Sequence, residues 1–183
     1  MRASQRVLFC LALACLSSFA AGQRSDQVLA ERVLGPQWKQ VSRRAGMIFA
    51  GTVLSAAPQA PANDRTVSGT APTLRLSFRV DLAIAGVEPG QILTIHEWEG
   101  ARLLHRPMRN GQRVLIFLYP RSRLGLTSPV GGPLGQVALD PSGSFVSQQE
   151  LRLRNQIFPK APEDTNRVSV AELGRAIRSA RQE

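Results

Sequence analysis

Cysteine is nearly absent from this chain of 183 residues, and the two that occur, Cys10 and Cys15, lie close to the N-terminus. We expect both to belong to a signal peptide, which would leave a mature chain without a thiol. Such a chain has no disulfide, no cysteine-based zinc site and no cysteine nucleophile. Its fold would rest on an apolar core alone, and about 160 residues are enough to bury one in a single domain.

Recognisable catalytic motifs are also missing. The sequence has no Gly-x-Ser-x-Gly elbow, His-Glu-x-x-His pair, P-loop or dinucleotide fingerprint. The glycine-rich stretch 131–135 lacks the lysine and the following helical pattern of a phosphate-binding loop, so we interpret it as a turn. We therefore expect a protein that is not an enzyme and that carries no cofactor.

The first 22 residues have the order of a secretory signal peptide. Arg2 and Arg6 precede a short apolar run over 7–16, and small residues follow. This order predicts cleavage after Ala20 or Gly22, and the apolar run is too short to span a bilayer as a helix. We expect an exported protein, periplasmic or extracellular, without a membrane-spanning segment.

Lipid attachment at Cys15 is the alternative to cleavage. The stretch Leu11-Ala-Leu-Ala-Cys15 loosely resembles a bacterial lipobox, although Ala12 and Leu13 stand where leucine and a small residue are usual. In that case the exported chain would be a lipoprotein held on a membrane.

The chain is strongly basic, with 23 lysines and arginines against 13 acidic residues and a net charge of +10. Only Lys39 and Lys160 are lysines, so the excess is arginine. One interpretation is an anionic partner such as a cell-surface polymer, a membrane surface or nucleic acid. The other is a solvated surface with scattered arginines, as in a GC-rich genome. The even spread along the chain favours the second, and export argues against nucleic acid.

Residues 73–85 predict one long β-strand, because apolar and polar side chains alternate strictly. The apolar set is Leu74, Leu76, Phe78, Val80, Leu82 and Ile84, and the polar set is Arg75, Ser77, Arg79 and Asp81. We expect the first set to face a core and the second to face solvent.

Further strands are predicted at 47–56, 92–98 and 114–119, with a terminal hairpin of 136–139 and 144–147. Gly51 marks a bulge or close approach inside the first of them. Turns are expected at Glu88–Gly90 and at Asn110-Gly111, and a loop at 57–72.

Helices are predicted at both ends of the mature chain. Residues 25–45 carry an apolar stripe that includes Trp38, and Ser169 with Glu172 forms a capping box before a second stripe. The C-terminal helix would pack on the sheet or, alternatively, lie on a membrane surface. The expected organisation is a signal peptide over 1–22, a helical segment over 23–45, a β-barrel over 46–150, and a linker with a helix over 151–183.

Three segments, Arg44–Val53, Phe78–Gly86 and Asn110–Tyr119, together resemble the strand pattern of netrin-like modules. That family includes the tissue inhibitors of metalloproteinases and many cysteine-free bacterial secreted proteins. The resemblance covers about residues 44–147. It implies a mainly β fold, a small OB-like barrel of five to six strands with one flanking helix at each end.

The resemblance does not extend to the inhibitory mechanism of the animal proteins. They chelate the protease zinc with a mature N-terminal cysteine, whereas this chain would begin with Ala21 or Gln23. The bacterial pattern also commonly has Lys-Gly after the long strand, where this chain has Ala85-Gly86.

Candidate site residues gather in one short segment and on the long strand. His96, Trp98 and His105 could line a binding surface together with Arg75 and Arg79. A metal site is not expected, because on a strand His96 faces away from Glu97 and Glu99. We expect an exported, non-enzymatic binding or accessory module whose ligand is an unidentified protein or an anionic surface. The alternative is an inhibitor or accessory partner of an exported protease, acting through loops.

Overall fold

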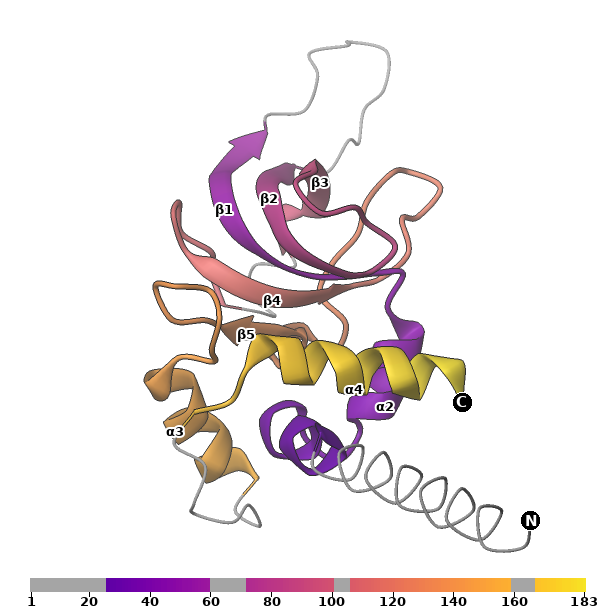
Figure 1. Cartoon of the computed structure of the whole chain (residues 1–183). Helices are drawn as coiled ribbons and strands as arrows, with labels where there is room; N and C mark the ends of the chain where they lie inside the picture. Colours follow the sequence, from indigo (N-terminus) through magenta and orange to yellow (C-terminus); the bar gives the residue numbers. More distant parts are fainter. Residues whose placement is uncertain (1–25, 60–71, 101–105, 159–166) are drawn as a thin grey trace, which may run out of the picture.

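The structure, a computed structural model, describes residues 26–59, 72–100, 106–158 and 167–183. Cys15, Ala20, Gly22 and His105 lie outside these residues. Over the described residues the chain forms an antiparallel five-stranded sheet with the order β3-β2-β1-β4-β5 (Figure 1). The strands are β1 (Met47–Gln59), β2 (Thr73–Ala85), β3 (Ile92–Trp98), β4 (Arg113–Leu118) and β5 (Gln136–Ala138). The prediction of a mainly β fold is confirmed.

Strand β2 has the predicted bounds, but its alternation changes side near its end. Gly51 pairs with Val80 and Ala50 pairs with Leu82, so Asp81 is an extra residue, a β-bulge. The apolar residues from Leu74 to Val80 therefore face one core cluster, whereas Leu82 and Ile84 face the other. The expectation of a single apolar face along the whole strand is wrong for its last third.

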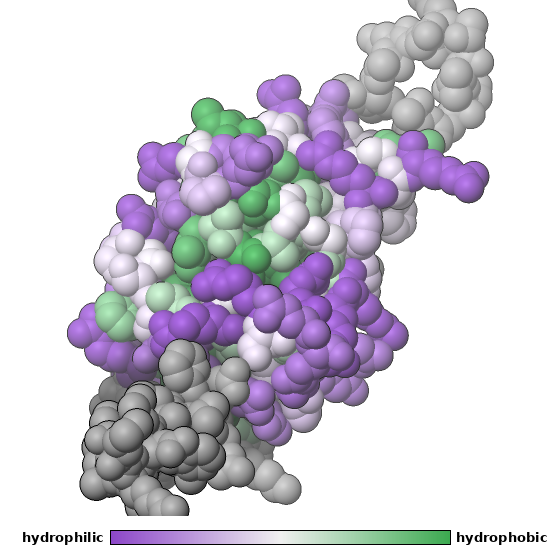
Figure 2. All heavy atoms as spheres, turned by 45° about the vertical axis from the view of Figure 1, so that its right-hand side comes forward, coloured by the Kyte–Doolittle hydropathy of each residue, from purple (hydrophilic) through white to green (hydrophobic). Residues whose placement is uncertain are grey.

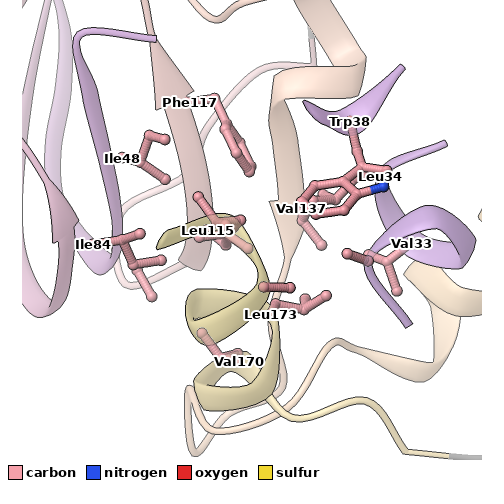
Figure 3. Close-up of a cluster of buried hydrophobic side chains, with 14 of the residues drawn as sticks. Val33, Leu34, Trp38, Ile48, Ile84, Leu115, Phe117, Val137, Val170 and Leu173 are labelled. Carbon is pink, nitrogen blue, oxygen red and sulfur yellow. The ribbon is translucent and has the colours of Figure 1, made fainter. Parts of the chain in front are cut away.

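Two apolar clusters lie on opposite faces of the sheet, as shown by β4, whose successive residues alternate between them. The first cluster lies between the sheet and the helices (Figure 3). The second contains Phe49 and Phe78, whose rings meet edge to face at 5.4 Å, and β1 and β2 curve around it (Figure 1). The strands thus supply one core from their own side chains, and the helices complete the other.

The helices are a segment over residues 26–34, α2 (Trp38–Arg44), α3 (Gln148–Ile157) and α4 (Val170–Gln182), with a short 3-10 turn η2 (Gly132–Gly135). The predicted helical segment 25–45 is broken at Gly35, whose φ of 83° ends the first helix. Among the helices of the described residues, none has the length and apolar character needed to cross a bilayer.

Helix α4 confirms the C-terminal prediction. Its apolar face is buried against the sheet and α2, and Ser169 caps its N-terminus by accepting a hydrogen bond from the Ala171 amide. Burial of this face contradicts the alternative of a helix lying on a membrane surface, because a membrane-bound helix needs that face free. Arg181 donates to the carbonyls of Ser42 and Ala45 at the end of α2, which ties the two helices together.

The sheet is not closed into a continuous barrel. Within the described part of the chain, the edge strands β3 and β5 are not paired with each other. Residues 126–130 instead touch both sides of the opening through isolated bridges. His96 pairs with Leu126 in parallel, and Leu118 pairs with Pro129 in antiparallel fashion. The predicted terminal hairpin is similarly reduced, since β5 is followed by a single bridge between Leu139 and Val146.

Candidate binding surface

The side chains of β3 divide between the core and the solvent. Leu93, Ile95 and Glu97 are buried, so the alternation of a strand places Thr94, His96 and Trp98 on the other face. His96 and Glu97 therefore point to opposite sides of the sheet, as their spacing predicts. The outward face of β3 is the one that can meet a ligand.

The register of β2 against β3 gathers the predicted residues on that same face. Arg75 lies directly opposite His96, Thr73 opposite Trp98 and Arg79 opposite Ile92. We name this surface the β2–β3 outer face, and it consists of Thr73, Arg75, Ser77, Arg79, Ile92, Thr94, His96 and Trp98. Four of the five predicted surface residues thus share one face. The fifth, His105, lies outside the described residues.

Trp98 offers one side of its ring to solvent. The residue is 51% exposed. A Cβ placed on Gly100 would lie 2.5 Å from the six-membered ring, so the other side of the indole packs over the Gly100 backbone. Because Gly100 has no side chain, the ring lies flat against the protein. An aromatic ring held in this way is a stacking platform for a planar or cyclic group.

The two arginines of this face differ in their electrostatic surroundings. The Nε of Arg79 donates to the Asp81 carboxylate at 3.1 Å, and Thr52 donates to the same carboxylate at 2.9 Å. Arg75 is exposed and forms no ion pair with any residue that the structure describes. Arg75 is therefore the cation available to a ligand, whereas the charge of Arg79 is largely compensated.

Polar groups that the sequence did not single out continue the face beyond Arg75. The hydroxyls of Ser77 and Thr94 lie 3.1 Å apart across the two strands. Arg121, from the loop after β4, donates to the Thr94 carbonyl at 2.9 Å and adds a cation at the edge of β3. The proximity of Arg121 to β3 depends on long-range folding, and no local pattern of the sequence predicts it.

In the described part of the chain, His, Cys, Asp and Glu side chains do not gather in groups of three that could hold a metal ion. Glu97 is fully buried and His96 lies on the opposite face. His105 lies outside the described residues, so the expectation that it contributes to no metal site stays a prediction.

Comparisons with protein-family models, with curated proteins and with solved structures found no match to this chain. The function must therefore be inferred from the geometry of the β2–β3 outer face.

Proposed function

We propose that this chain is an exported, non-enzymatic binding module that holds an anionic ligand on the β2–β3 outer face. The observation that carries the proposal is the cross-strand pair of Arg75 and His96, two residues along the strands from the Trp98 platform. Export is supported by the signal-peptide pattern of residues 1–22.

We further propose that the scaffold is an OB-like barrel of the netrin-like kind. Two observations support this. Residues 126–130 bridge β3 in parallel and β4 in antiparallel orientation, and they thereby span the gap in the sheet. The Thr127 amide donates to the His96 carbonyl at 2.9 Å, and the Val130 amide donates to the Phe117 carbonyl at 2.8 Å. In OB-type barrels the surface of the second and third strands is the usual ligand-binding face.

The chemistry of the face favours an acidic ligand that carries a ring. The Arg75 guanidinium presents several N–H donors in one plane, which suits a carboxylate, sulfate or phosphate. Two residues along a strand span about 7 Å, so a ring stacked on Trp98 leaves its acidic substituent close to Arg75 and His96. The Ser77 and Thr94 hydroxyls can then accept or donate to neutral polar groups further along.

Binding to immobilised dextran sulfate, an acidic polymer of sugar rings, tests this proposal. We expect Arg75→Gln and Trp98→Ala each to weaken the affinity about tenfold, because each removes one recognition element. The matched control is Arg152→Gln, which removes an exposed arginine from α3, away from the face.

The two arginine variants have the same net charge, so they separate a site from general basicity. Weakening by Arg75→Gln together with unchanged binding by Arg152→Gln supports the proposal. Equal weakening by both would show that the chain binds polyanions through its overall charge, and the proposed site would then be wrong.

A further inference from the structure

The loop after β4 lies beside the edge strand β3, and hydrogen bonds define its backbone. The Ser122 amide donates to the Leu126 carbonyl, the Gly125 amide donates to the Ser122 carbonyl, and the Leu126 amide donates to the Ser122 hydroxyl. Arg121 fastens the loop to Thr94 of β3. We name residues Arg121–Gly125 the basic loop.

A large apolar side chain stands at the tip of this closed turn. Leu124 is 84% exposed, the highest value among the exposed large hydrophobic residues of the described chain, and Ile92 follows at 68%. Ile92 is two residues before Thr94, which the loop contacts, and Tyr119 at the base of the loop is also partly exposed. Figure 2 shows one face of the molecule, on which hydrophobic residues (green) gather in the middle and hydrophilic residues (purple) surround them.

The charge of the surrounding sequence has one sign. Between Glu99 and Asp140 the chain has no acidic residue, and it has six arginines, among them Arg121 and Arg123, which both precede the tip residue Leu124. Arg123 is exposed and makes no ion pair with a described residue. The basic loop therefore combines an apolar tip with uncompensated cations.

We propose that the basic loop docks this protein on the surface of an anionic phospholipid bilayer. Leu124 enters the boundary between headgroups and acyl chains, and Arg121 and Arg123 stay at the level of the lipid phosphates. This inference goes beyond the proposed function, because it concerns a surface beside the β2–β3 outer face and does not require a ligand there. An exposed leucine that directly follows an exposed arginine suits a bilayer, which offers apolar depth and anionic headgroups together. A polysaccharide offers only the anionic part.

Co-sedimentation of the full chain with vesicles tests the inference. The vesicles are phosphatidylcholine alone or phosphatidylcholine with phosphatidylglycerol, at low and at moderate salt. We expect binding to the phosphatidylglycerol vesicles, about tenfold weaker in Leu124→Ser and about fivefold weaker in Arg123→Gln. The matched controls are Leu153→Ser and Arg152→Gln, both at exposed positions of α3, and both are expected to bind like the wild type.

The outcomes separate insertion from simple charge attraction. If Arg123→Gln and Arg152→Gln weaken binding equally and Leu124→Ser does not weaken it, the protein adsorbs through general basicity and the inference is overturned. It is likewise overturned if phosphatidylglycerol vesicles are not bound. Dextran sulfate binding that depends on Arg75 could still hold in both cases, so the proposed function would survive.

A second measurement reports the depth of the tip directly. In a Leu124→Trp variant the new indole takes the place of the tip side chain, and its fluorescence is followed with vesicles that carry brominated acyl chains. We expect quenching well above that of the wild-type protein, whose indoles are the buried Trp38 and the platform Trp98. Equal quenching in both proteins would show that residue 124 stays in water.

Discussion

Phe78 tests the alternation of β2 at the scale of one residue. Its side chain is fully buried and packs edge to face against Phe49, whereas the neighbouring Arg79 lies on the outer face. We expect Phe78→Ala to lower the free energy of unfolding by about 3–5 kcal/mol, and Arg79→Ala by less than about 1 kcal/mol because its ion pair with Asp81 is exposed. Denaturant titration measures both values. Similar midpoints for the two variants would mean that the face assignment of β2 is wrong.

Substitutions at two glycines between β2 and β3 distinguish the cost of backbone strain from the cost of a steric clash. Gly86 and Gly90 have φ values of 68° and 78°, so alanine is strained at either position. A Cβ at Gly90 meets nothing within 4 Å, whereas one at Gly86 would clash with the Gly46 carbonyl. We expect Gly90→Ala to cost about 1–2 kcal/mol and Gly86→Ala to cost about 1–3 kcal/mol more. Equal melting temperatures for the two variants would contradict the close approach of Gly46.

The bulge at Asp81 could not be predicted from the residues of β2 alone. Strict alternation from Leu74 to Ile84 predicts one apolar face, and the sequence contains no local mark of an inserted residue. The bulge depends on the partner strand, because Gly51 of β1 lets the backbone of β2 come close at Arg79. Gly51 was predicted as a bulge or a point of close approach. Its effect on β2 could not be predicted, because it depends on which residues of the two strands pair.

At the scale of elements, α3 was not predicted because two of its three buried residues, Glu150 and Arg154, are charged and only Leu151 is apolar. Glu150 and Arg154, each 1% exposed at the side chain, form a buried ion pair at 2.7 Å, and Arg154 also donates to the Gln136 carbonyl. Because charged residues occupy most of the buried positions of this helix, its sequence shows no hydrophobic stripe from which the helix could be predicted. The available signal was the spacing of Ser147 and Glu150, since the Ser147 hydroxyl accepts a hydrogen bond from the Glu150 amide.

The turn after β5 makes the stability of the fold depend on pH through Asp140. Burial alone would raise the pKa of Asp140, but hydrogen bonds from the Ser142 hydroxyl and from the amides of Phe145, Gly143 and Ser144 lower it below the ordinary value. A lowered pKa in the folded state means that the ionised carboxylate stabilises the fold. This contribution is present above the pKa of the unfolded chain and is lost as the pH falls through the folded pKa.

We therefore expect Asp140→Asn to be less stable than the wild type at pH 7, with a difference that shrinks as the pH falls from about 5 to about 2. Melting temperatures across that range measure it. The control Glu88→Gln removes a carboxylate from the exposed turn before β3. A stability difference that does not change with pH would show that Asp140 acts through its shape and not through its charge.

At the scale of the whole molecule, the sequence predicted the set of surface residues but not their arrangement. Alternation alone placed Arg75 and Arg79 on one face of a strand and His96 and Trp98 on one face of another. That Arg75 lies opposite His96, and that the loop carrying Arg121 reaches β3, depends on the pairing of distant segments. The strands and turns are local and could be predicted, whereas register and loop placement could not.

Only the folded chain shows which arginines form ion pairs with acidic residues and which do not. Along the sequence the arginines are spread out, which favoured a solvated surface. In the structure several are engaged within the protein, such as Arg154 with Glu150, Arg175 with Asp26 and Arg79 with Asp81. Arg75 and Arg123 remain without an ion pair among the described residues and lie on and beside the β2–β3 outer face. Exposed arginines elsewhere, such as Arg152 of α3 and Arg178 of α4, likewise form no ion pair with a described residue, so uncompensated charge is present at the proposed ligand surface but is not confined to it.

The most direct test of that surface is a nuclear magnetic resonance titration of the protein with a dextran sulfate oligosaccharide. We expect the shifted backbone amides to cluster at Arg75, Ser77, Thr94 and His96. The indole N–H of Trp98 should shift, whereas that of the buried Trp38 should not. Shifts that centre on α3 or α4, or that spread evenly over all arginines, would contradict the assignment of the β2–β3 outer face as the binding surface.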